Sequence, residues 1–219
     1  MTDKDSLDNQ HPHWENTFTE NQEMFGSEPS EPACLALERF KQEGVTSIVE
    51  LGAGQGRDTL FFAQQGLHVY ALEYTETGAK TIAEKAEKLG LSHRIIVIHH
   101  DVRNPLPVGD AVFDACYSHM LFCMAFTTEE LETLSAEIRR VLLPKGLTIY
   151  TVRSTDDKHY RAGIARGEDL YEVNGFIVHF FNQEKIEHLA TGYQIVDISR
   201  LQEGELPREL FMVTLRKMD

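Results

Sequence analysis

The sequence has few cysteines and no long apolar run. Three cysteines occur among 219 residues, an odd number without CxxC spacing, which argues against both a disulfide framework and a structural zinc site. We therefore expect reduced thiols and no bound metal. No apolar segment approaches the roughly 20 residues of a membrane helix, and residues 1–15 are acidic and polar where a signal peptide is basic and then apolar. These features predict a cytoplasmic protein that does not span a membrane.

Basic side chains are also scarce. Lys and Arg number 21 against 35 Asp and Glu, which gives a formal net charge of -14. Because nucleic-acid binding draws most of its affinity from cations that neutralise phosphates, we do not expect RNA or DNA as a partner. The acidity favours solubility, and attraction of a cationic ligand is a second interpretation. The oligomeric state is left open.

The length and composition predict one folded domain. A chain of 219 residues with 42% hydrophobic and 26% charged residues can bury a sizeable core but is short for two domains and a linker. Residues 1–30 are polar yet carry Trp14, Phe18, Met24 and Phe25, too many large apolar groups for a disordered tail. We therefore expect a single domain over residues 1–219, with residues 1–30 packed as a cover.

Strands and helices alternate through the middle of the sequence. Predicted strands cover residues 47–51, 68–72, 94–98, 112–117 and 147–152. Predicted helices lie between them, and Pro144 and Gly146 are expected to end the last one. Such alternation predicts an α/β fold with a parallel sheet covered on both faces. Two final strands, 193–199 and 210–215, are joined by a turn region with Gly204 and Pro207, which predicts an antiparallel hairpin.

A glycine-rich segment follows the first predicted strand. Residues 50–56 read Glu-Leu-Gly-Ala-Gly-Gln-Gly and lie between a strand and a helix. At such a junction glycine lets the backbone turn tightly and approach a ligand. Ligands of open α/β sheets bind beyond the carboxyl ends of the strands, so this loop is the first candidate binding element.

Polar side chains follow the later predicted strands. Glu73 lies about 20 residues past the glycines, a spacing at which a carboxylate can accept both hydroxyls of an adenosine ribose. Asp101 is placed to accept a hydrogen from an adenine amino group, and Val102 to lie against the ring. Ser118 and His119 follow the fourth strand. Either acid taken singly could be a solvated loop carboxylate, but two at successive strand ends beside a glycine loop favour a nucleoside site.

A nicotinamide-dependent oxidoreductase shares the loop and the first acid. Its G-x-G-x-x-G fingerprint requires a small third residue, where this chain has Arg57. That difference disfavours a pyrophosphate ligand, and no Gly-Lys-Ser or Gly-Lys-Thr of a P-loop follows. A module that binds a nucleoside cofactor without catalysing a reaction is a further alternative.

Together these features resemble the class I S-adenosylmethionine-dependent methyltransferases. The resemblance covers nearly the whole chain and rests on the ExGxGxG loop, Glu73, Asp101, Phe113-Asp114, Pro144-Lys145-Gly146 and the terminal hairpin. Within that superfamily, two segments are similar to the tellurite-resistance and thiopurine methyltransferase branch: Gly54-Gln55-Gly56-Arg57, and the opening from His13-Trp14-Glu15 through Met24-Phe25-Gly26 to Pro29-Ser30. Ala53 departs from that branch, because many relatives of the tellurite group carry cysteine there. The resemblance implies a Rossmann-like, seven-stranded, mostly parallel sheet with S-adenosyl-L-methionine at the ends of strands one to four.

The predicted cofactor-binding residues come from the loop, the strand ends and the N-terminal cover. They are Trp14, Phe25, Glu50, Gly52, Gly54, Gly56, Arg57, Glu73, Tyr74, Asp101, Val102 and Ser118. Because a sulfonium makes its methyl carbon electrophilic, the enzyme mainly has to hold an acceptor lone pair in line and exclude water. A general base is needed only if the acceptor carries a proton when it binds. We expect a small-molecule acceptor, with a soft sulfur, selenium or tellurium nucleophile as one candidate.

The acceptor side is expected beyond the fifth strand. Residues 154–181 are too long for a plain connection and rich in aromatic and polar groups, which predicts a lid over the acceptor. The predicted catalytic residues are His119, Tyr160 and Arg161. His159 and His179 are further candidates for a base. Each histidine could instead have a surface or hydrogen-bonded structural role, and the segment could instead pack between the sheet and the hairpin.

Overall fold

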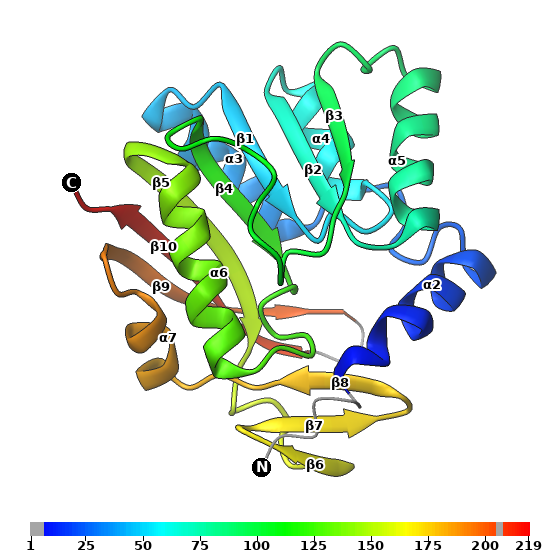
Figure 1. Ribbon diagram of the computed structural model, residues 1–219, viewed down its shortest axis with the longest axis vertical. Coiled ribbons are helices and arrows are strands. Elements are labelled where there is room, and N and C mark those ends of the chain that lie inside the picture. Colours follow the sequence, from blue (N-terminus) through cyan, green and yellow to red (C-terminus); the bar gives the residue numbers. More distant parts are fainter. Residues whose placement is uncertain (1–6, 205–207) are drawn as a thin grey trace.

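A seven-stranded sheet forms the centre of the computed structural model, which describes residues 7–204 and 208–219 (Figure 1). The strand order is β3-β2-β1-β4-β5-β10-β9. The strands are β1 (Ser47–Leu51), β2 (His68–Glu73), β3 (Ile95–His99), β4 (Phe113–His119), β5 (Leu142–Arg153), β9 (Tyr193–Glu203) and β10 (Arg208–Lys217). β1 to β5 pair in parallel, whereas β10 is antiparallel to both of its neighbours. This arrangement confirms the predicted Rossmann-like, mostly parallel sheet with a C-terminal antiparallel hairpin.

Helices cover both faces of the sheet, as predicted. On one face lie α3 (Glu31–Glu43), α4 (Arg57–Gln64) and α5 (Glu76–Lys88), and on the other α6 (Thr128–Val141) and α7 (Gln183–Leu189). Phe40, Phe62 and Ile82 are buried on the first face, and Leu131 and Ile186 on the second. Because both faces are covered, the central strands are apolar along their length, and the open edge at their carboxyl ends is where a site can form.

The helix caps follow the local sequence. Ser30 accepts a hydrogen bond from the Ala33 amide at the start of α3, and Asn182 caps α7. Thr127 and Glu130 form a reciprocal capping box at the start of α6, a pattern that the spacing of the two residues in the sequence indicates.

The fifth strand begins earlier than predicted. α6 ends at Val141 and β5 starts at the next residue, so the expected strand start at Leu147 was wrong by five residues. Phe113 pairs with Leu142 and Ala115 with Leu147, so residues 143–146 loop out of the pairing. The final hairpin is also longer than predicted, and the Pro207 assigned to its turn lies outside the described residues.

Part of the predicted lid folds as a second, three-stranded antiparallel sheet. It consists of β6 (Ile164–Gly167), β7 (Leu170–Val173) and β8 (Phe176–His179), joined by turns with positive φ at Glu168, Asp169 and Asn174. These strands are short and were not predicted. α2 (Gln10–Glu20) runs between this sheet and α5, beyond the carboxyl ends of the central strands (Figure 1).

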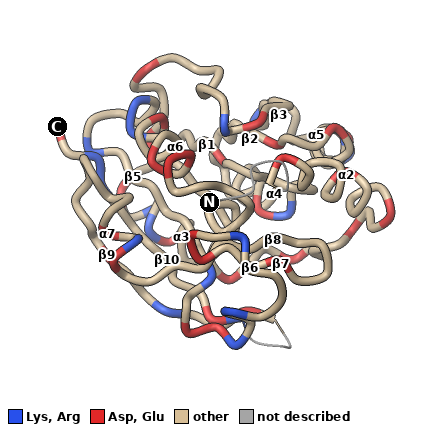
Figure 2. Tube along the Cα trace, turned by 60° about the horizontal axis from the view of Figure 1, so that its bottom comes forward, with Lys and Arg blue, Asp and Glu red and all other residues tan. Residues whose placement is uncertain are grey.

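The structure places the charged residues and the cysteines that the composition counts. Acidic and basic residues are interspersed over the elements of the described chain (Figure 2). Within residues 7–204 and 208–219, no helix is both long and apolar enough for a membrane span, and no group of three or more His, Cys, Asp or Glu is arranged to hold a metal ion. All three cysteines are free thiols, and burial raises the pKa of Cys116 to about 12.

Candidate functional site

The glycine loop turns over the carboxyl ends of β1 and β2. Gly52 and Gly54 have φ of 69° and 58°, a left-handed conformation that favours glycine. The amides of Gly52 and Ala53 donate to the Leu72 carbonyl at 2.9 and 3.1 Å, which ties the loop to the end of β2. These two hydrogen bonds join the loop to the carboxyl end of the neighbouring strand β2.

The space above Gly54 is bounded by two aromatic rings. A Cβ built on Gly54 would lie 3.7 Å from both Phe18 and Phe25, whereas one on Gly52 would lie 2.9 Å from Leu121. Gly54 is thus the loop position where the backbone faces the N-terminal cover at van der Waals distance. The amides of Gly52, Ala53 and Gly54 already donate within the protein, so this side of the loop offers a ligand chiefly the apolar surface of the two rings.

Glu73 lies at the end of β2 with its carboxylate turned toward the loop. One oxygen accepts the Gly54 amide at 2.8 Å, and the other accepts the Thr75 amide at 2.9 Å and hydroxyl at 2.7 Å. The residue is 3% exposed, and burial raises its pKa. A carboxylate has about four acceptor positions; these three bonds fill three of them, and the Tyr74 backbone supplies a further hydrogen bond. A ribose hydroxyl would have to replace one of these protein partners, and the predicted contact with both ribose hydroxyls stays a prediction.

Asp101, predicted to meet an adenine amino group, is held by a neighbour that the sequence analysis missed. Arg103 donates to both oxygens of Asp101, through Nε at 3.1 and 3.0 Å and through Nη2 at 2.6 Å. Its Nη1 donates to Asp8 at 2.7 Å. Burial opposes the effect, but the Arg103 hydrogen bonds hold the pKa of Asp101 below its usual value. Val102, next to it, is buried.

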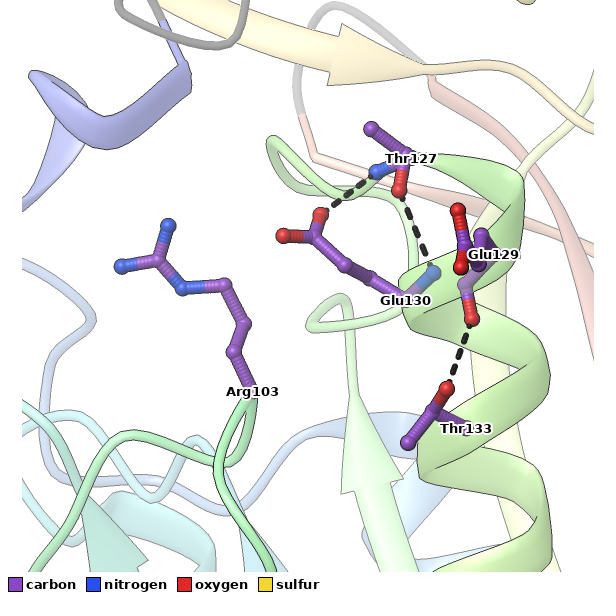
Figure 3. Close-up of a pocket in the computed structure, with 5 residues that line it drawn as sticks. All are labelled: Arg103, Thr127, Glu129, Glu130 and Thr133. Carbon is purple, nitrogen blue, oxygen red and sulfur yellow. Dashed lines mark hydrogen bonds between the residues drawn. The ribbon is translucent and has the colours of Figure 1, made fainter.

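Arg103 also faces an open pocket. Figure 3 shows its side chain across a gap from the first turn of α6, where Thr127 and Glu130 bond to each other. Glu129 and Thr133 complete the lining. Arg103 therefore connects the end of β3 both to this pocket and to the N-terminal segment through Asp8.

Glu50 lies beneath the loop and not at its open side. It is 4% exposed, and its Oε2 accepts the Thr59 hydroxyl of α4 at 2.5 Å. Burial, followed by the nearby charge of Asp58, raises the pKa of Glu50 to about 8. In this position the side chain fastens the start of α4 to β1, and its predicted contact with a cofactor stays a prediction.

The N-terminal segment is fastened to the loop side of the sheet. The Glu15 carboxylate accepts the amides of Glu76 and Thr77 at 2.8 and 3.0 Å, at the first turn of α5. The Gln55 side chain donates to the Asn21 carbonyl at 2.6 Å. Glu15 was named from the sequence only within the segment similar to the tellurite-resistance and thiopurine branch, and its capping role was not predicted because the helix end that it caps is 61 residues away.

Aromatic side chains of the cover run from the small sheet to the glycine loop. The ring of Trp14 lies 4.9 Å from that of Phe176 and 5.5 Å from that of Phe18. The ring of Phe25 lies 6.1 Å from that of Phe18, and the Arg57 guanidinium lies 5.9 Å from Phe25. The structure thus brings the predicted residues Trp14, Phe25 and Arg57 together at one edge.

Tyr74 lies where the cover meets β2 and β3. Its carbonyl receives hydrogen bonds from His11 at 2.9 Å and His99 at 2.8 Å. The His11 and Tyr74 rings meet edge to face at 4.9 Å. Tyr74 therefore links α2 to the strand end that carries Glu73.

His119 lies at the end of β4 with both ring nitrogens engaged. Nδ1 lies 2.8 Å from the Thr151 hydroxyl of β5, and Nε2 lies 3.0 Å from a Glu203 carboxylate oxygen. Ser118 beside it is 1% exposed and donates to the Leu51 carbonyl at 3.2 Å. Neither Thr151 nor Glu203 was singled out from the sequence, because they come from strands that only the fold brings to β4.

The other predicted catalytic residues belong to the small-sheet region. Tyr160 donates its hydroxyl to Asp169 at 2.7 Å, and the exposed Arg161 stacks 5.0 Å from the Tyr160 ring. Among the described residues, neither has a recorded interaction with His119. The three predicted catalytic side chains are therefore not brought together as one cluster.

The two further histidines have structural partners. His159 lies 3.0 Å from Asp157, which also binds the buried Arg153. His179 is fully buried, and its Nδ1 lies 2.9 Å from the Phe126 carbonyl. Burial and the charge of Lys185 lower the pKa of His179 to about 4. Packing and hydrogen bonding therefore explain the positions of His159 and His179 without a role as a base.

Comparison with known families assigns the central part of the chain. Residues 48–146 match a family described as a methyltransferase domain. The match covers the glycine loop, Glu73, Asp101 and His119, and it confirms the predicted enzyme class, a methyltransferase with S-adenosylmethionine as cofactor. A search of curated proteins finds no match.

Solved structures share the fold at low sequence identity. A Burkholderia thailandensis 1,6-didemethyltoxoflavin-N1-methyltransferase with bound 1,6-didemethyltoxoflavin and S-adenosylhomocysteine is 23% identical, with a TM-score of 0.69 over 86% of this chain and 78% of that one. A Methanosarcina mazei S-adenosylmethionine-dependent methyltransferase is 18% identical, with a TM-score of 0.70 over 84% and 97%. The cyclase SpnF is 20% identical, with a TM-score of 0.67 over 85% and 79%. At these identities the likeness shows the fold.

Proposed function

We propose that this protein transfers the methyl group of S-adenosylmethionine to a small-molecule acceptor by direct in-line displacement. The observation that carries the proposal is the left-handed loop at Gly52 and Gly54, joined through the Gly54 amide to Glu73 at the end of β2. A methyltransferase-domain match covers this same segment. The 1,6-didemethyltoxoflavin bound to the Burkholderia thailandensis enzyme supports a small molecule as the kind of acceptor.

The residues on the loop side fit the cofactor. The apolar cover of Phe18 and Phe25 suits its thioether part, and Glu73 would bind a ribose hydroxyl in place of one of its present protein partners. When bound, the cofactor supplies an electrophilic methyl carbon on a sulfonium. The chain's own task is to hold the acceptor in line with that carbon and keep water away.

In the proposed adenine site, Asp101 stays hydrogen-bonded to Arg103 while it binds the adenine amino group. Four hydrogen bonds reach the two Asp101 oxygens, three from the Arg103 guanidinium and one from the Arg103 amide at 3.0 Å, so an adenine amino group would share an oxygen with Arg103. Arg103 then orients the carboxylate and joins Asp8 of the N-terminal segment to the site. Trp14, Phe25 and Tyr74 form the other side of the proposed cover.

The proposal extends to the organisation of the chain. Residues 1–219 act as a single domain, residues 1–30 cover the cofactor, and residues 154–181 form a lid on the acceptor side. Similarity to the tellurite-resistance and thiopurine branch, a soft sulfur, selenium or tellurium acceptor, and a cytoplasmic location belong to this proposal as well. Contacts of α2 with both the glycine loop and the small sheet support a cover that spans the two halves.

Titration calorimetry tests the proposal. We expect S-adenosylmethionine and S-adenosylhomocysteine to bind at one site and reduced nicotinamide dinucleotides not to bind. Tight binding of a reduced dinucleotide would favour the oxidoreductase alternative. Cofactor binding without product formation across a broad acceptor panel would favour a module without methyl transfer, a relevant alternative because the cyclase SpnF shares this fold.

A further inference from the structure

The tip of the C-terminal hairpin reaches the end of β4. Leu210 pairs with Arg153, the last residue of β5, so Glu203 and Arg208 lie beyond the end of β5. From there the Glu203 carboxylate reaches His119, which lies 84 residues earlier in the chain. The hairpin tip therefore adds a side chain to the open edge of the sheet beside the glycine loop.

Hydrogen-bond partners fix the orientation of His119. The Thr151 hydroxyl oxygen accepts the Met120 amide at 3.0 Å, which leaves its own hydrogen free to point at Nδ1 of His119. Nε2 then carries the hydrogen that is donated to Glu203. With Thr151 fully buried and both nitrogens occupied, the imidazole has no free nitrogen for an acceptor.

Glu203 differs from His119 because one of its oxygens has no hydrogen bond within residues 7–204 and 208–219. Oε1 accepts from His119, whereas Oε2 has, among the described residues, only an ion-pair contact with Arg208 at 3.7 Å. The side chain is 22% exposed. Burial opposes the effect, but His119, Arg57 and Arg208 hold the pKa of Glu203 below its usual value, so it is a carboxylate at neutral pH.

We propose that Glu203 binds the methyl acceptor through Oε2, and that His119 is the positioning residue that holds Glu203 in place. The proposal rests on the function proposed above and specifies its substrate class. A carboxylate oxygen only accepts hydrogen bonds, so the acceptor atom carries an N–H or O–H group, as in an amine, a phenol or an alcohol. An unprotonated thiolate or selenide has no hydrogen to donate to Oε2, so this inference selects N–H and O–H acceptors over the soft nucleophile included in the proposed function.

The chemistry balances with Glu203 as proton acceptor. The nitrogen or oxygen lone pair of the acceptor forms the new bond to the methyl carbon, and the electron pair of the broken sulfur–carbon bond stays on sulfur. The hydrogen of the acceptor atom leaves as a proton to Oε2. Nε2–H of His119 stabilises the carboxylate before this transfer and orients its free oxygen throughout.

Variants of the hairpin tip test the proposal. Glu203→Gln keeps the shape but loses the charge, Glu203→Asp keeps the charge, and Glu209→Gln on the neighbouring strand is the matched control. Each is titrated with S-adenosylmethionine, and its S-adenosylhomocysteine complex is titrated with a panel of amines, phenols and alcohols and with thiophenolate and selenite. Turnover of the same panel is followed with methyl-labelled cofactor.

We expect equal cofactor affinity in all variants and roughly tenfold or greater loss of acceptor affinity and turnover in Glu203→Gln. Glu203→Asp should recover part of that loss, which a merely structural role would not predict. His119→Gln should lower acceptor turnover without changing cofactor affinity.

Three outcomes would overturn the role of Glu203. These are equal acceptor affinity in Glu203→Gln, binding of thiophenolate or selenite only, and no binding of any amine, phenol or alcohol at millimolar concentration. Failure of the wild-type protein to bind S-adenosylmethionine would instead contradict the proposed function itself, so the two failures are distinguishable.

Discussion

The two halves of the sheet edge are assembled in different ways. On the cofactor half, at the ends of β1 to β3, the key contact joins Gly54 and Glu73, only 19 residues apart. On the acceptor half, at the ends of β4 and β5, His119 meets Glu203 across 84 residues, and Gln10 of α2 meets Gly175 of the small sheet across 165. The contact between Gly54 and Glu73 in the proposed cofactor half is thus encoded locally. The N-terminal cover of that half, which Glu15 joins to Glu76 across 61 residues, and the proposed acceptor half form only once distant segments have folded together.

The two halves also differ in the direction in which burial shifts the pKa of an ionisable group. On the cofactor half, burial raises the pKa of Glu50 to about 8, and on the acceptor half burial lowers that of His179 to about 4. Both groups are therefore neutral near pH 7, one as an acid and one as a base. The two halves should consequently respond to pH with opposite sign.

Gly54→Val should have the largest effect. The branched side chain occupies the space between the loop and the rings of Phe18 and Phe25, at a left-handed backbone position. We expect loss of measurable S-adenosylmethionine binding by calorimetry, with the fold retained by circular dichroism. Gly44→Val has a comparable backbone φ with open space around it and is the control; equal affinity in a folded Gly54→Val protein would show that the loop is not the site.

Glu50→Gln tests the cofactor half through stability. Because folding raises the pKa of Glu50 from 4.5 to about 8, the folded state binds more protons than the unfolded state within this window. The contribution of Glu50 to the free energy of unfolding is fully present below pH 4.5 and is lost as the pH rises through about 8. The glutamine variant should avoid this loss, which amounts to up to about 5 kcal/mol. Denaturant titrations across this pH range measure it, and an unchanged pH slope relative to the exposed-site control Glu38→Gln would contradict it.

Glu73→Ala should weaken cofactor binding while leaving the acceptor half intact. A ribose hydrogen bond to the carboxylate is lost, and the Gly54 amide loses its partner. The expected cost is on the order of 2 to 4 kcal/mol, or roughly 30-fold to 1000-fold in affinity. Glu84→Ala, on the exposed side of α5, is the control for calorimetry. If both variants bind S-adenosylmethionine equally well, Glu73 is not a ligand.

His179→Asn tests the acceptor half with the opposite sign. Folding lowers the pKa of His179 from 6.5 to about 4, so the unfolded state binds more protons in this window and stability is lost as the pH falls through it. The free energy of unfolding of the wild-type protein should fall by about 3 kcal/mol as the pH drops from 6.5 to about 4, because His179 must be protonated. The free energy of unfolding of His179→Asn should not fall for this reason. Urea titrations at several pH values measure the difference. The exposed His188→Asn should keep the wild-type slope, and the same slope in His179→Asn would refute the assignment.

The lid variants should show the smallest effect. Tyr160→Ala and Arg161→Ala should lower acceptor turnover severalfold with little change in S-adenosylmethionine affinity, because ordering a polar segment costs conformational entropy that ligand contacts offset. Lys158→Ala is the control from the same segment. In hydrogen exchange, amides of residues 154–181 should gain protection when S-adenosylhomocysteine and acceptor are both present. Equal protection with and without ligands would indicate that the segment only packs.

The contrast also explains what the sequence could predict. Helix caps such as Thr127 with Glu130, the glycine turn and the spacing to Glu73 are local patterns, so the α/β fold and the cofactor edge were predictable. β6 to β8 are short and have no clear apolar alternation, so they were not. Glu203 lies in a polar hairpin tip, and its neighbourhood with His119 depends on how far the hairpin extends past β5. Arg103 was missed for a different reason, because its pairing with Asp101 is local but indistinguishable from an ordinary surface ion pair.

The most direct test of the account is transfer of labelled methyl from S-adenosylmethionine, measured with the purified wild-type protein and a panel of amines, phenols, alcohols and thiols. The account predicts that the label appears in a small-molecule acceptor together with an equal amount of S-adenosylhomocysteine, and that Gly54→Val abolishes both. Absence of S-adenosylmethionine binding, or transfer that persists in Gly54→Val, would contradict it.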